Sequence, residues 1–509
     1  MTGLDAGSAV AVVGTGTMGQ GIAQVALLGG HQVLLHDSAE GRARAAAEGI
    51  AARLARLVEK ERLTAAERDA ALAGLRTAER PADLAAAALV VEAVVERLDV
   101  KRALLSGLEE IVDDDCLLAT NTSSLSVTAI GGALREPGRL VGLHFFNPVP
   151  LLPLVEVVSG VATDEAAATR AYATARAWGK TPVRCADTPG FIVNRVARPF
   201  YAEALRLYEE NVADPATIDA VLRESGGFRM GPFELMDLIG QDVNEAVTRS
   251  VWEAFHHDPR FAPSSAQRRL VEAGLLGRKS GRGWYAYGDG AERPAPRTEP
   301  PTAPPARVGV HGRPTGPLRV LVEMLAEAGI ETERDRTPNY ADSFVALPHG
   351  AKLSVTQGDT ATGEVTGPAV LVDLALDYRA CTRVALAAGD DADPADLAAA
   401  VGLFQRLGKD VSVVDDAPGM IVARTVAMLA DFALDAEGRG IATGEDIDTA
   451  MRLGVNYPRG PLAWGAELGA RWVGQTLSCL NDAYPGGRYG ASPWLSRRGH
   501  LDYKRELGR

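Results

Sequence analysis

The feature of this sequence that most constrains its fold is an internal repeat at a fixed spacing of 229 residues. Gly179-Lys180, for example, recurs as Gly408-Lys409. Further pairs at the same spacing are Asp187 and Asp416, Pro189-Gly190 and Pro418-Gly419, Arg195 and Arg424, Ile218-Asp219 and Ile447-Asp448, and Gly231-Pro232 and Gly460-Pro461. Because the register holds without a gap, the sequence predicts a duplicated unit.

A glycine pattern near the start predicts a dinucleotide site. The strand-like run AVAVVG leads into Gly14-Thr15-Gly16-Thr17-Met18-Gly19, and a helix-like stretch follows. Gly14 permits a tight turn, Gly16 lets the backbone approach a pyrophosphate, and Gly19 allows close packing of helix and strand. Asp37 ends the next strand-like run, and its carboxylate suits the ribose hydroxyls of NAD but would repel the 2′-phosphate of NADP. Met18 is included among the predicted cofactor contacts, and FAD is the less favoured alternative.

The order of periodic patterns predicts the fold class. Strand-like and helix-like stretches alternate over residues 1–186, whereas residues 190–285 have helical period. The second copy repeats this order more weakly, starting with a strand-like run at Leu318–Glu323. We therefore expect an α/β Rossmann-like NAD-binding domain plus an all-α domain, followed by a degenerate second copy (mixed α/β plus all-α). The predicted boundaries are 1–187 and 188–288 for the first copy, 289–317 for a proline-rich linker, and 318–415 and 416–509 for the second copy.

Composition excludes several classes of protein. Acidic residues number 66 and basic residues 53, a formal net charge of −13, which argues against a nucleic-acid partner. No apolar run approaches the ~20 residues of a membrane helix, and the start lacks a secretory pattern. The four cysteines, which lie far apart, are Cys116, Cys185, Cys381 and Cys479. We therefore expect a cytoplasmic protein with reduced thiols, no clustered metal site and no membrane partner.

A histidine and a glutamate indicate base catalysis. His144 follows a strand-like run, and Glu156 comes twelve residues later. A histidine can take a hydroxyl proton while the same carbon loses a hydride, and a carboxylate on its other ring nitrogen fixes the tautomer. The residues alone leave open that His144, beside two phenylalanines, and Glu156, among valines, are packed core residues.

Over roughly residues 8–287 the sequence resembles the 3-hydroxyacyl-CoA dehydrogenase family. The matching stretches, in the family's order, are VVGTGTMGQGIA, VVEAVVERLDVK, NTSSL, GLHFFNPVP, LVEVV, DTPGFIVNR, GPFELMDLIG and GRKSGRGWY. The resemblance implies oxidation of an (S)-3-hydroxyacyl-CoA to a 3-oxoacyl-CoA, with hydride transfer to NAD. It also implies that an acyl-CoA is the partner of the site.

The same resemblance assigns roles residue by residue. His144 resembles the base that takes the hydroxyl proton, Glu156 its orienting acid, and Ser123 and Asn194 the residues that hold the substrate oxygen. The implied cofactor contacts beyond the glycine turn are Ser123, Asn147, Glu96, Lys101 and Lys279. Without the family, capping and turn formation would explain Ser123 and Asn194 as well, and a solvated loop charge would explain Lys279.

Two cations are candidate contacts of coenzyme A. Lys60 matches a family position near CoA, and Arg53 lies two helical turns earlier on the same face. The family often carries a small hydroxyl residue in this place. A solvated helix face explains Lys60 and Arg53 about as well.

The tandem architecture narrows the substrate. It resembles the tandem dehydrogenases of bacterial phenylacetate degradation, which implies 3-hydroxyadipyl-CoA or 3-hydroxybutyryl-CoA as substrate and a place in fatty acid or related β-oxidation metabolism. One alternative is an NAD-dependent dehydrogenase of the same fold that acts on a free hydroxy acid or sugar acid. Another is a non-catalytic binding protein that kept the fold.

The second copy has lost the candidate chemistry. At the repeat spacing, Asp373 replaces His144, Ala385 replaces Glu156 and Ala423 replaces Asn194. We therefore expect one active site per chain. The second helical domain is expected to pair with the first as an intrachain pseudo-dimer, or alternatively to form an interface in a homo-oligomer.

Overall fold

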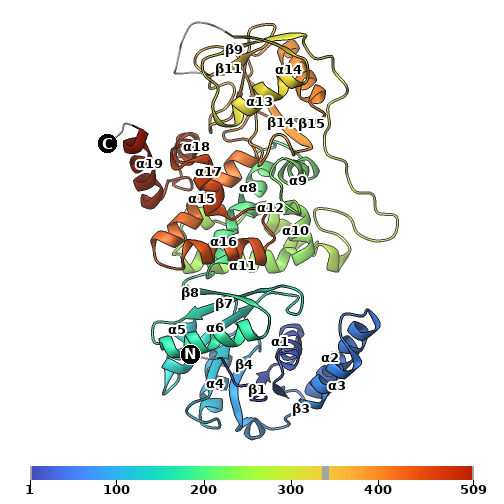
Figure 1. Ribbon diagram of the computed structural model, residues 1–509, viewed down its shortest axis with the longest axis vertical. Helices are drawn as coiled ribbons and strands as arrows, with labels where there is room; N and C mark the ends of the chain where they lie inside the picture. Colours follow the sequence, from blue (N-terminus) through green and yellow to red (C-terminus); the bar gives the residue numbers. More distant parts are fainter. Residues whose placement is uncertain (1–2, 335–342, 507–509) are drawn as a thin grey trace. The chain divides into compact units, whose positions relative to one another are not determined.

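The computed structural model describes residues 3–334 and 343–506. Parts of the predicted domains at 1–2, 335–342 and 507–509 lie outside the described residues. The chain divides into two compact units. The first unit comprises residues 1–195 and 436–455, and the second comprises residues 196–435 and 456–509. Figure 1 shows both, coloured along the sequence.

A twisted α/β sheet forms the centre of the first unit (Figure 1). Its strand order is β3-β2-β1-β4-β5-β6-β7-β8. β6 and β7 pair antiparallel, whereas the other neighbouring pairs are parallel. The strands are β1 (Ala9–Val13), β2 (Gln32–His36), β3 (Leu75–Thr77), β4 (Ala87–Glu92), β5 (Leu117–Thr120), β6 (Leu140–Phe145), β7 (Leu154–Ser159) and β8 (Thr181–Ala186).

Helices cover this sheet because its central strands are apolar on both faces. All residues of β5 and β6 are buried, as expected for a parallel sheet between two helical layers. The helices are α1 (Thr17–Leu28), α2 (Arg42–Glu59), α3 (Ala65–Ala73), α4 (Leu98–Glu109), α5 (Val127–Gly131), α6 (Glu165–Ala177) and α7 (Val193–Val196). Short 3-10 turns are η1 (Pro81–Leu84) and η2 (Pro137–Arg139). This arrangement brings the carboxyl ends of β1, β4, β5 and β6 to one edge, where ligands of such sheets bind.

The first helical domain follows in the second unit. Its elements are α8 (Arg198–Glu209), α9 (Pro215–Glu224), α10 (Pro232–Ile239), α11 (Gln241–Ala254), η3 (Pro259–Phe261), α12 (Ser265–Glu272) and η4 (Arg278–Ser280). Two family stretches named above, GPFELMDLIG and GRKSGRGWY, contact one another in this domain. The buried carboxylate of Asp237 accepts hydrogen bonds from the N–H groups of Trp284 and Tyr285 and from the Tyr287 hydroxyl. These stretches therefore have a structural role in closing the helical domain.

The second copy contains a smaller mixed sheet, with strand order β10-β9-β11-β12-β13-β14-β15. Its strands are β9 (Arg307–His311), β10 (Glu331–Arg334), β11 (Phe344–Ala346), β12 (Lys352–Val355), β13 (Ala369–Val372), β14 (Arg383–Ala388) and β15 (Asp410–Val413). Its helices are α13 (Gly316–Glu327) and α14 (Pro394–Arg406). Together with the first copy, this sheet confirms the predicted fold class.

The start of this second sheet differs from the prediction. The strand expected at Leu318–Glu323 is wrong, because those residues lie in helix α13. Leu318, Leu321, Val322 and Leu325 are buried, and their spacing is that of one helix face. The first strand is β9 instead, inside the predicted linker, where Val308 and Val310 alternate with less buried neighbours. The apolar run was too short for its period to distinguish a helix from a strand.

The second helical domain has the same order of helices as the first. Its elements are α15 (Val422–Gly438), α16 (Gly444–Gly454), α17 (Pro461–Leu468), α18 (Ala470–Ala483) and α19 (Pro493–Glu506). α10 and α11 begin 229 residues before α17 and α18, so the repeat holds at the level of single helices. α16 belongs to the first unit, where it packs on β7 and β8.

The two copies exchange hydrogen bonds reciprocally. In the first unit the Ala186 N–H donates to the Ile441 carbonyl oxygen, at an N···O distance of 2.8 Å. In the second unit the Asp415 N–H donates to the Val212 carbonyl oxygen, at 3.0 Å. Each partner of one bond lies 229 residues from its counterpart in the other. Such i-to-j and j-to-i pairing is the signature of a two-fold, isologous contact.

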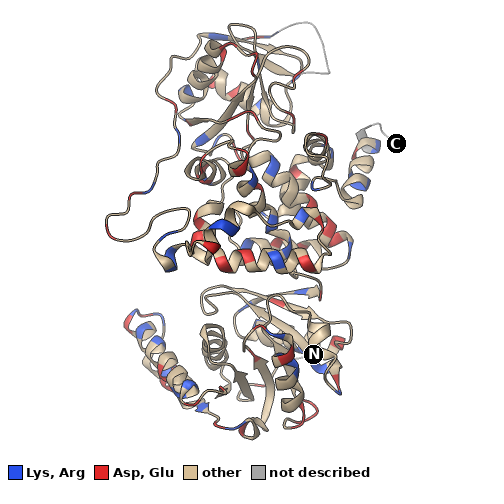
Figure 2. Cartoon of the chain, turned by 180° about the vertical axis from the view of Figure 1, so that it is seen from behind, with Lys and Arg blue, Asp and Glu red and all other residues tan. Residues whose placement is uncertain are grey.

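Along the helices, acidic and basic residues alternate with one another rather than forming long stretches of one sign (Figure 2). A negative net charge therefore does not exclude a local site that binds an anion. Over the described residues, none of the helices is both long and apolar enough to span a membrane.

Candidate functional site

The glycine turn after β1 has the geometry that a dinucleotide requires. Gly14 has a φ of 95°, and a Cβ there would lie 2.5 Å from the Ala93 carbonyl oxygen. A Cβ on Gly19 would lie 1.8 Å from the Gly14 carbonyl oxygen. A Cβ on Gly16 would meet no atom within 4 Å, so the backbone is open at this point. These positions fit the pyrophosphate of NAD at the start of α1.

The start of α1 can receive an anion. Gly16 is its N-cap, and within the described residues no side chain caps this helix. The first N–H groups of a helix carry partial positive charge and attract phosphate. Met18 lies one residue into the helix and packs partly buried against the core under the sheet. The predicted contact of Met18 with the cofactor stays a prediction.

Asp37 lies at the end of β2, beside the glycine turn. Its Oδ2 accepts hydrogen bonds from the N–H and hydroxyl of Thr15, at 2.9 and 2.7 Å. Burial alone would raise the pKa of Asp37, but the bonds from Thr15 and from the Ala39 N–H hold it below its ordinary value. The carboxylate is therefore ionised and fixed next to Gly14, where it can accept bonds from ribose hydroxyls.

His144 and Glu156 are brought together by the pairing of β6 and β7. The antiparallel register places the two residues directly opposite one another. His144 Nδ1 lies 2.6 Å from Glu156 Oε2, and the two side chains are 7% and 0% exposed. The register therefore explains the spacing of twelve residues, and a carboxylate on Nδ1 leaves Nε2 of the ring to act on a substrate proton.

The glutamate is itself held by the backbone. Glu156 Oε1 accepts hydrogen bonds from the N–H groups of Ile192 and Val193, at 3.0 and 2.9 Å. The ring of His144 packs against Phe146 and Phe191, with ring centroids 4.5 and 5.6 Å away. Two contacts on the carboxylate and two aromatic neighbours fix the histidine in one orientation, which is what preorganised base catalysis needs.

Ser123 and Asn194 also meet in the first unit. Asn194 Nδ2 lies 3.4 Å from the carbonyl oxygen of Ser123, a long hydrogen bond. Ser123 is half-buried, and its hydroxyl lies 3.4 Å from Glu96 Oε1. The structure thus joins the NTSSL loop to the start of α7, which also carries the N–H groups that hold Glu156.

A buried charge cluster organises that loop. Lys101 is 1% exposed, and its Nζ lies 2.6 Å from Glu92 and 3.2 Å from Glu96. Burial would raise the pKa of Glu96, but the Lys101 ammonium and the bonds from Thr122 and Ser123 keep it below its ordinary value. The Lys101 ammonium therefore lies inside the protein, paired with Glu92 and Glu96, and its predicted contact with the cofactor stays a prediction.

Glu92 and Asn121 are residues that the sequence reasoning missed. Glu92 closes the apolar run of β4, and its carboxylate accepts bonds from Lys101, from Thr120 Oγ1 at 2.6 Å and from the Val94 N–H at 2.7 Å. Asn121 Oδ1 accepts a bond from the Phe145 N–H, next to the histidine. A charged residue at the end of a buried strand was the signal that could have identified Glu92.

Asn147 lies two residues after the end of β6 and precedes a cis proline bond to Pro148. The position is three residues after His144, at the edge of the sheet where β1 and β4 also end. This placement is compatible with the predicted contact to the nicotinamide end of NAD.

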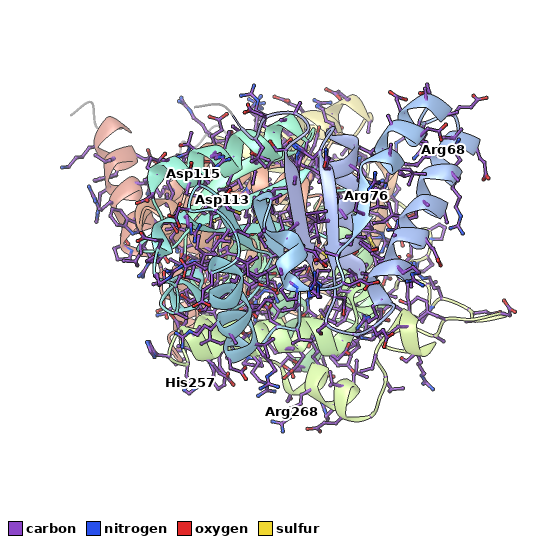
Figure 3. All side chains as sticks on the ribbon, turned by 90° about the horizontal axis from the view of Figure 1, so that it is seen from below. Arg68, Arg76, Asp113, Asp115, His257 and Arg268 are labelled. Carbon is purple, nitrogen blue, oxygen red and sulfur yellow. The ribbon has the colours of Figure 1, made fainter. Side chains whose placement is uncertain are left out.

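The two candidate CoA cations differ in their surroundings. Lys60 is exposed at the end of α2. Arg53 is half-buried and donates to Gln24 Oε1 at 3.1 Å and to Gln20 Oε1 at 3.0 Å. Arg53 thus ties α2 to α1, while Lys60 remains accessible. Arg68, on the adjoining α3, is a further cation of this hairpin (Figure 3).

Lys279 lies in the second unit. Its Nζ is 2.7 Å from Asp242 Oδ2, so the ammonium pairs with a carboxylate at the start of α11. The pair is substantially exposed, with 45% and 39% of the side chains accessible. An exposed ion pair is worth little in water, so the ammonium can exchange its partner for a ligand.

The second copy shows how the histidine–glutamate pair was lost. Asp373, at the histidine position, accepts hydrogen bonds from the N–H groups of Ile421, Val422 and Ala423, at 3.0, 2.7 and 3.1 Å. Ile421 and Val422 are the counterparts of the two residues that bond to Glu156. In the second copy, the carboxylate that accepts from these N–H groups therefore comes from the histidine position, and Ala385 occupies the glutamate position. Burial raises the pKa of Asp373 to about 6 despite these bonds.

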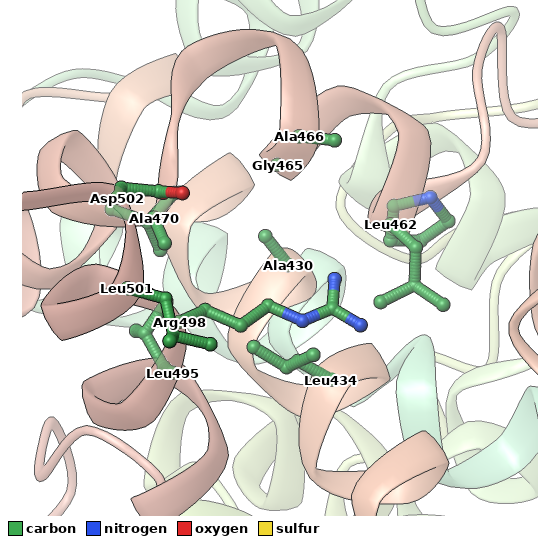
Figure 4. A pocket seen from close by; sticks show the side chains of 12 residues that line it. Ala430, Leu434, Leu462, Gly465, Ala466, Ala470, Leu495, Arg498, Leu501 and Asp502 are labelled. Atoms are coloured by element: carbon green, nitrogen blue, oxygen red, sulfur yellow. The ribbon is translucent and has the colours of Figure 1, made fainter. Parts of the chain in front are cut away.

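A cavity of about 390 Å³ lies in the second helical domain (Figure 4). It arises where side chains are smaller than in the first copy. Four of its lining residues are Ala430, Gly465, Ala470 and Val473. The residues 229 positions earlier are Tyr201, Met236, Gln241 and Asn244. The lining contains no counterpart of the histidine–glutamate pair.

Comparison with known families covers most of the chain. Residues 9–188 match the family described as 3-hydroxyacyl-CoA dehydrogenase, NAD binding domain. Residues 190–287 and again 419–508 match the 3-hydroxyacyl-CoA dehydrogenase C-terminal domain. Residues 353–418 match the 3-hydroxybutyryl-CoA dehydrogenase reduced Rossmann-fold domain. The helical domain is thus matched twice, at the positions of the repeat.

Individual relatives of the chain are dehydrogenases that act on 3-hydroxyacyl-CoA esters, by their names. A 3-hydroxyadipyl-CoA dehydrogenase of Escherichia coli (strain K12) is 46% identical over 97% of this chain and 98% of its own length. A 3-hydroxybutyryl-CoA dehydrogenase of Mycobacterium tuberculosis is 41% identical over 56% of this chain and 99% of its own length. The crystal structure of a 3-hydroxybutyryl-CoA dehydrogenase from Escherichia coli K12 covers 99% of this chain and 100% of that one, with 43% identity and a TM-score of 0.89. The chain therefore belongs to the 3-hydroxyacyl-CoA dehydrogenase family, as an NAD-dependent oxidoreductase in tandem form.

Proposed function

We propose that the protein oxidises the 3-hydroxyl group of an (S)-3-hydroxyacyl-CoA, with His144 as the base and 3-hydroxyadipyl-CoA as the preferred substrate. The observation that carries this proposal is the buried His144–Glu156 pair, 2.6 Å apart, in an NAD-binding domain. When bound, NAD supplies the hydride acceptor. The residues of the chain supply the proton acceptor, its orientation and the hold on the substrate oxygen.

The roles follow from the contacts. Glu156 accepts from Nδ1 of His144, which leaves Nε2 unprotonated and able to take the hydroxyl proton. As the proton arrives, the imidazole becomes a cation, and the adjacent carboxylate stabilises it. Ser123 and Asn194, which meet in the first unit, hydrogen-bond the reacting oxygen. Asp37 and the glycine turn bind the adenosine and pyrophosphate parts of NAD.

The preference for the adipyl ester rests on the relative in Escherichia coli that matches almost the whole chain. The test is a panel of 3-hydroxyadipyl-CoA, 3-hydroxybutyryl-CoA and the free 3-hydroxy acids, followed by NADH absorbance. We expect turnover of both CoA esters, with the higher kcat/KM for the adipyl ester. Turnover of free hydroxy acids or sugar acids alone would favour the alternative function. Bound NAD without turnover of any ester would instead indicate a non-catalytic protein.

We also propose that the two helical domains form an intrachain pseudo-dimer. The reciprocal bonds Ala186–Ile441 and Asp415–Val212 support it. A buried charge cluster in the second unit supports it further. Arg424 of α15 lies 2.7 Å from Glu203 of α8, and both side chains are fully buried. Arg488, from the segment before α19, contacts the same carboxylate at 2.8 Å. One glutamate of the first copy thus joins two arginines of the second.

Glu203→Gln should destabilise the protein by about 3–5 kcal/mol, because it leaves the buried Arg488 guanidinium without its counter-charge and leaves Arg424 with Glu210 alone. Although burial favours the neutral acid, Arg488 and Arg424 lower the pKa of Glu203 to about 2, from an ordinary value of 4.5. A lowered pKa stabilises the folded state above pH 4.5, and that stabilisation is lost as the pH falls towards 2. Urea unfolding at pH 7 and at lower pH measures both effects.

The matched control is Glu272→Gln. Glu272 forms an exposed pair with Arg268, which Figure 3 labels on α12, and its loss should leave the unfolding midpoint unchanged. Equal midpoints for Glu203→Gln and the control would contradict the pseudo-dimer cluster.

Finally, we propose a cytoplasmic location, since the four cysteines of the described residues are free thiols, as is usual in a reducing compartment.

A further inference from the structure

Arg53, in the middle of α2, is a half-buried cation that bonds to two neutral glutamine side chains. Its Nε donates to Gln24 Oε1 at 3.1 Å, and its Nη1 donates to Gln20 Oε1 at 3.0 Å. Within the described part of the chain, its Nη2 is buried and has no hydrogen-bond partner. Burial, together with the nearby Arg56, lowers the pKa of Arg53. Because desolvating a cation is unfavourable, an apolar side chain would join the two helices at lower cost.

One of the two glutamines that Arg53 holds is itself bonded to the glycine turn. Gln20 Nε2 donates to the Thr15 carbonyl oxygen at 2.9 Å. The N–H and the hydroxyl of Thr15 in turn donate to Asp37 Oδ2. A continuous chain of hydrogen bonds therefore runs from α2 through α1 to the turn and on to the carboxylate at the end of β2. Every residue of this chain of bonds lies in the first unit.

Gly49 leaves room for this contact between the two helices. It lies in the interior of α2, one turn before Arg53, at a place where glycine is less favourable than alanine. A Cβ there would lie 3.3 Å from Gln20 Oε1, closer than an ordinary van der Waals contact, and 3.8 Å from Arg53 Nη1. α1 and α2, which pack against one another (Figure 1), thus approach closely where the glutamine and the arginine meet.

The bond to Thr15 fixes the backbone that borders the pyrophosphate position. The Thr15 carbonyl and the Gly16 N–H belong to one planar, trans peptide group, so they point in opposite directions. A donor on the carbonyl oxygen therefore also fixes the direction of the Gly16 N–H. Gly16 is the N-cap of α1, and a Cβ on it would meet no other described atom within 4 Å. This stretch of backbone is thus open to a phosphate.

We propose that Gln20 is a positioning residue of the NAD site and that Arg53 acts through it. The Gln20 amide holds the Thr15–Gly16 peptide group in the orientation that receives the pyrophosphate, and the Arg53 guanidinium holds the amide. Arg53 therefore belongs to the cofactor side of the site rather than to coenzyme A, and Lys60 stays the candidate CoA contact. The inference rests on NAD binding, and not on the identity of the acyl ester or on His144 as the base.

The test measures two affinities on the full chain: that for NADH, by its fluorescence, and that for 3-hydroxybutyryl-CoA, by titration calorimetry without cofactor. Gln20→Met removes the amide but keeps the length of the side chain. We expect its NADH dissociation constant to rise by about 3- to 10-fold, the value of one neutral hydrogen bond, while the ester constant stays unchanged. Arg53→Met should show a rise in the same range. Arg53→Lys, which can still donate to Gln20 Oε1, should show a smaller one.

A double-mutant cycle shows whether Arg53 acts through Gln20. The NADH constant of Gln20→Met combined with Arg53→Met should equal that of Gln20→Met alone, because the arginine then has no amide to hold. Additive losses in the combined variant would mean that Arg53 affects NADH by a separate route, and would overturn its role as a residue that acts through the glutamine.

The matched controls are Gln32→Met and Arg56→Met, which make the same changes at exposed positions of β2 and α2 and should leave both constants unchanged. An unchanged NADH affinity in Gln20→Met would overturn the proposal, and a lower urea midpoint would then show that the bond only packs the helices. A loss of ester affinity alone in Arg53→Met would make Arg53 a CoA contact and would overturn it as well. Because NADH binding needs no acyl-CoA, the substrate panel tests the proposed function separately.

Discussion

His144→Gln is expected to lose turnover by about 10²- to 10⁴-fold while it still binds NADH. Glutamine cannot take a proton from the substrate hydroxyl, but its amide can donate to Glu156 in place of the imidazole N–H. The carboxylate then keeps a partner, and its bonds to Ile192 and Val193 are undisturbed. Activity is followed by NADH absorbance with 3-hydroxybutyryl-CoA, and cofactor affinity by NADH fluorescence.

The matched control is His500→Gln, which makes the same chemical change on an exposed face of α19. It should retain full turnover. If His144→Gln kept more than about a tenth of the wild-type rate, a fall smaller than general base catalysis supplies, another group would have to accept the proton. If instead it lost NADH binding together with turnover, His144 would be part of the cofactor site rather than the base.

Local patterns in the sequence predicted the parts of the site that depend on local geometry. The glycine turn is of this kind, because three glycines between a strand and a helix leave few possible conformations, and Gly14 and Gly19 make the close contacts expected of them. The facing of His144 and Glu156 is different. It depends on the antiparallel pairing of β6 and β7, which the sequence did not predict, and the two residues were assigned as a pair through the family resemblance.

Features that depend on distant segments were not predictable from patterns. The burial of Lys101 between Glu92 and Glu96 joins three residues of one segment to the NTSSL loop, and a sequence pattern does not show which charged side chain turns inward. The short apolar run at Leu318–Glu323 fits either a strand or a helix face, and packing against the second sheet decided for the helix.

The substitution of Asp373 for the histidine shows which of two functions of Glu156 the fold requires. Glu156 orients His144 with one oxygen and receives the N–H groups of Ile192 and Val193 with the other. The second copy has no histidine to orient, yet it still has a carboxylate on the equivalent N–H groups, supplied from the neighbouring strand. The start of the helix thus needs an acceptor in either copy, whereas the orientation of a base is needed in the first copy alone.

We expect opposite outcomes for stability and activity in a pair of variants. Glu156→Ala alone should lose turnover by at least 10²-fold and destabilise the protein by about 2–5 kcal/mol, since it leaves two buried N–H groups and His144 Nδ1 without an acceptor. Adding His144→Asp reproduces the arrangement of the second copy, in which an aspartate and an alanine share the strand pair.

The double variant His144→Asp with Glu156→Ala should therefore regain most of the lost stability and remain inactive. Urea unfolding measures the first property and NADH absorbance the second. If the double variant were no more stable than Glu156→Ala, the aspartate would not be replacing the glutamate as acceptor, and the two strand pairs would not be equivalent. Recovery of stability without activity would separate the two functions of Glu156: the acceptor for the helix start can come from either strand, whereas the base requires both the histidine and the glutamate.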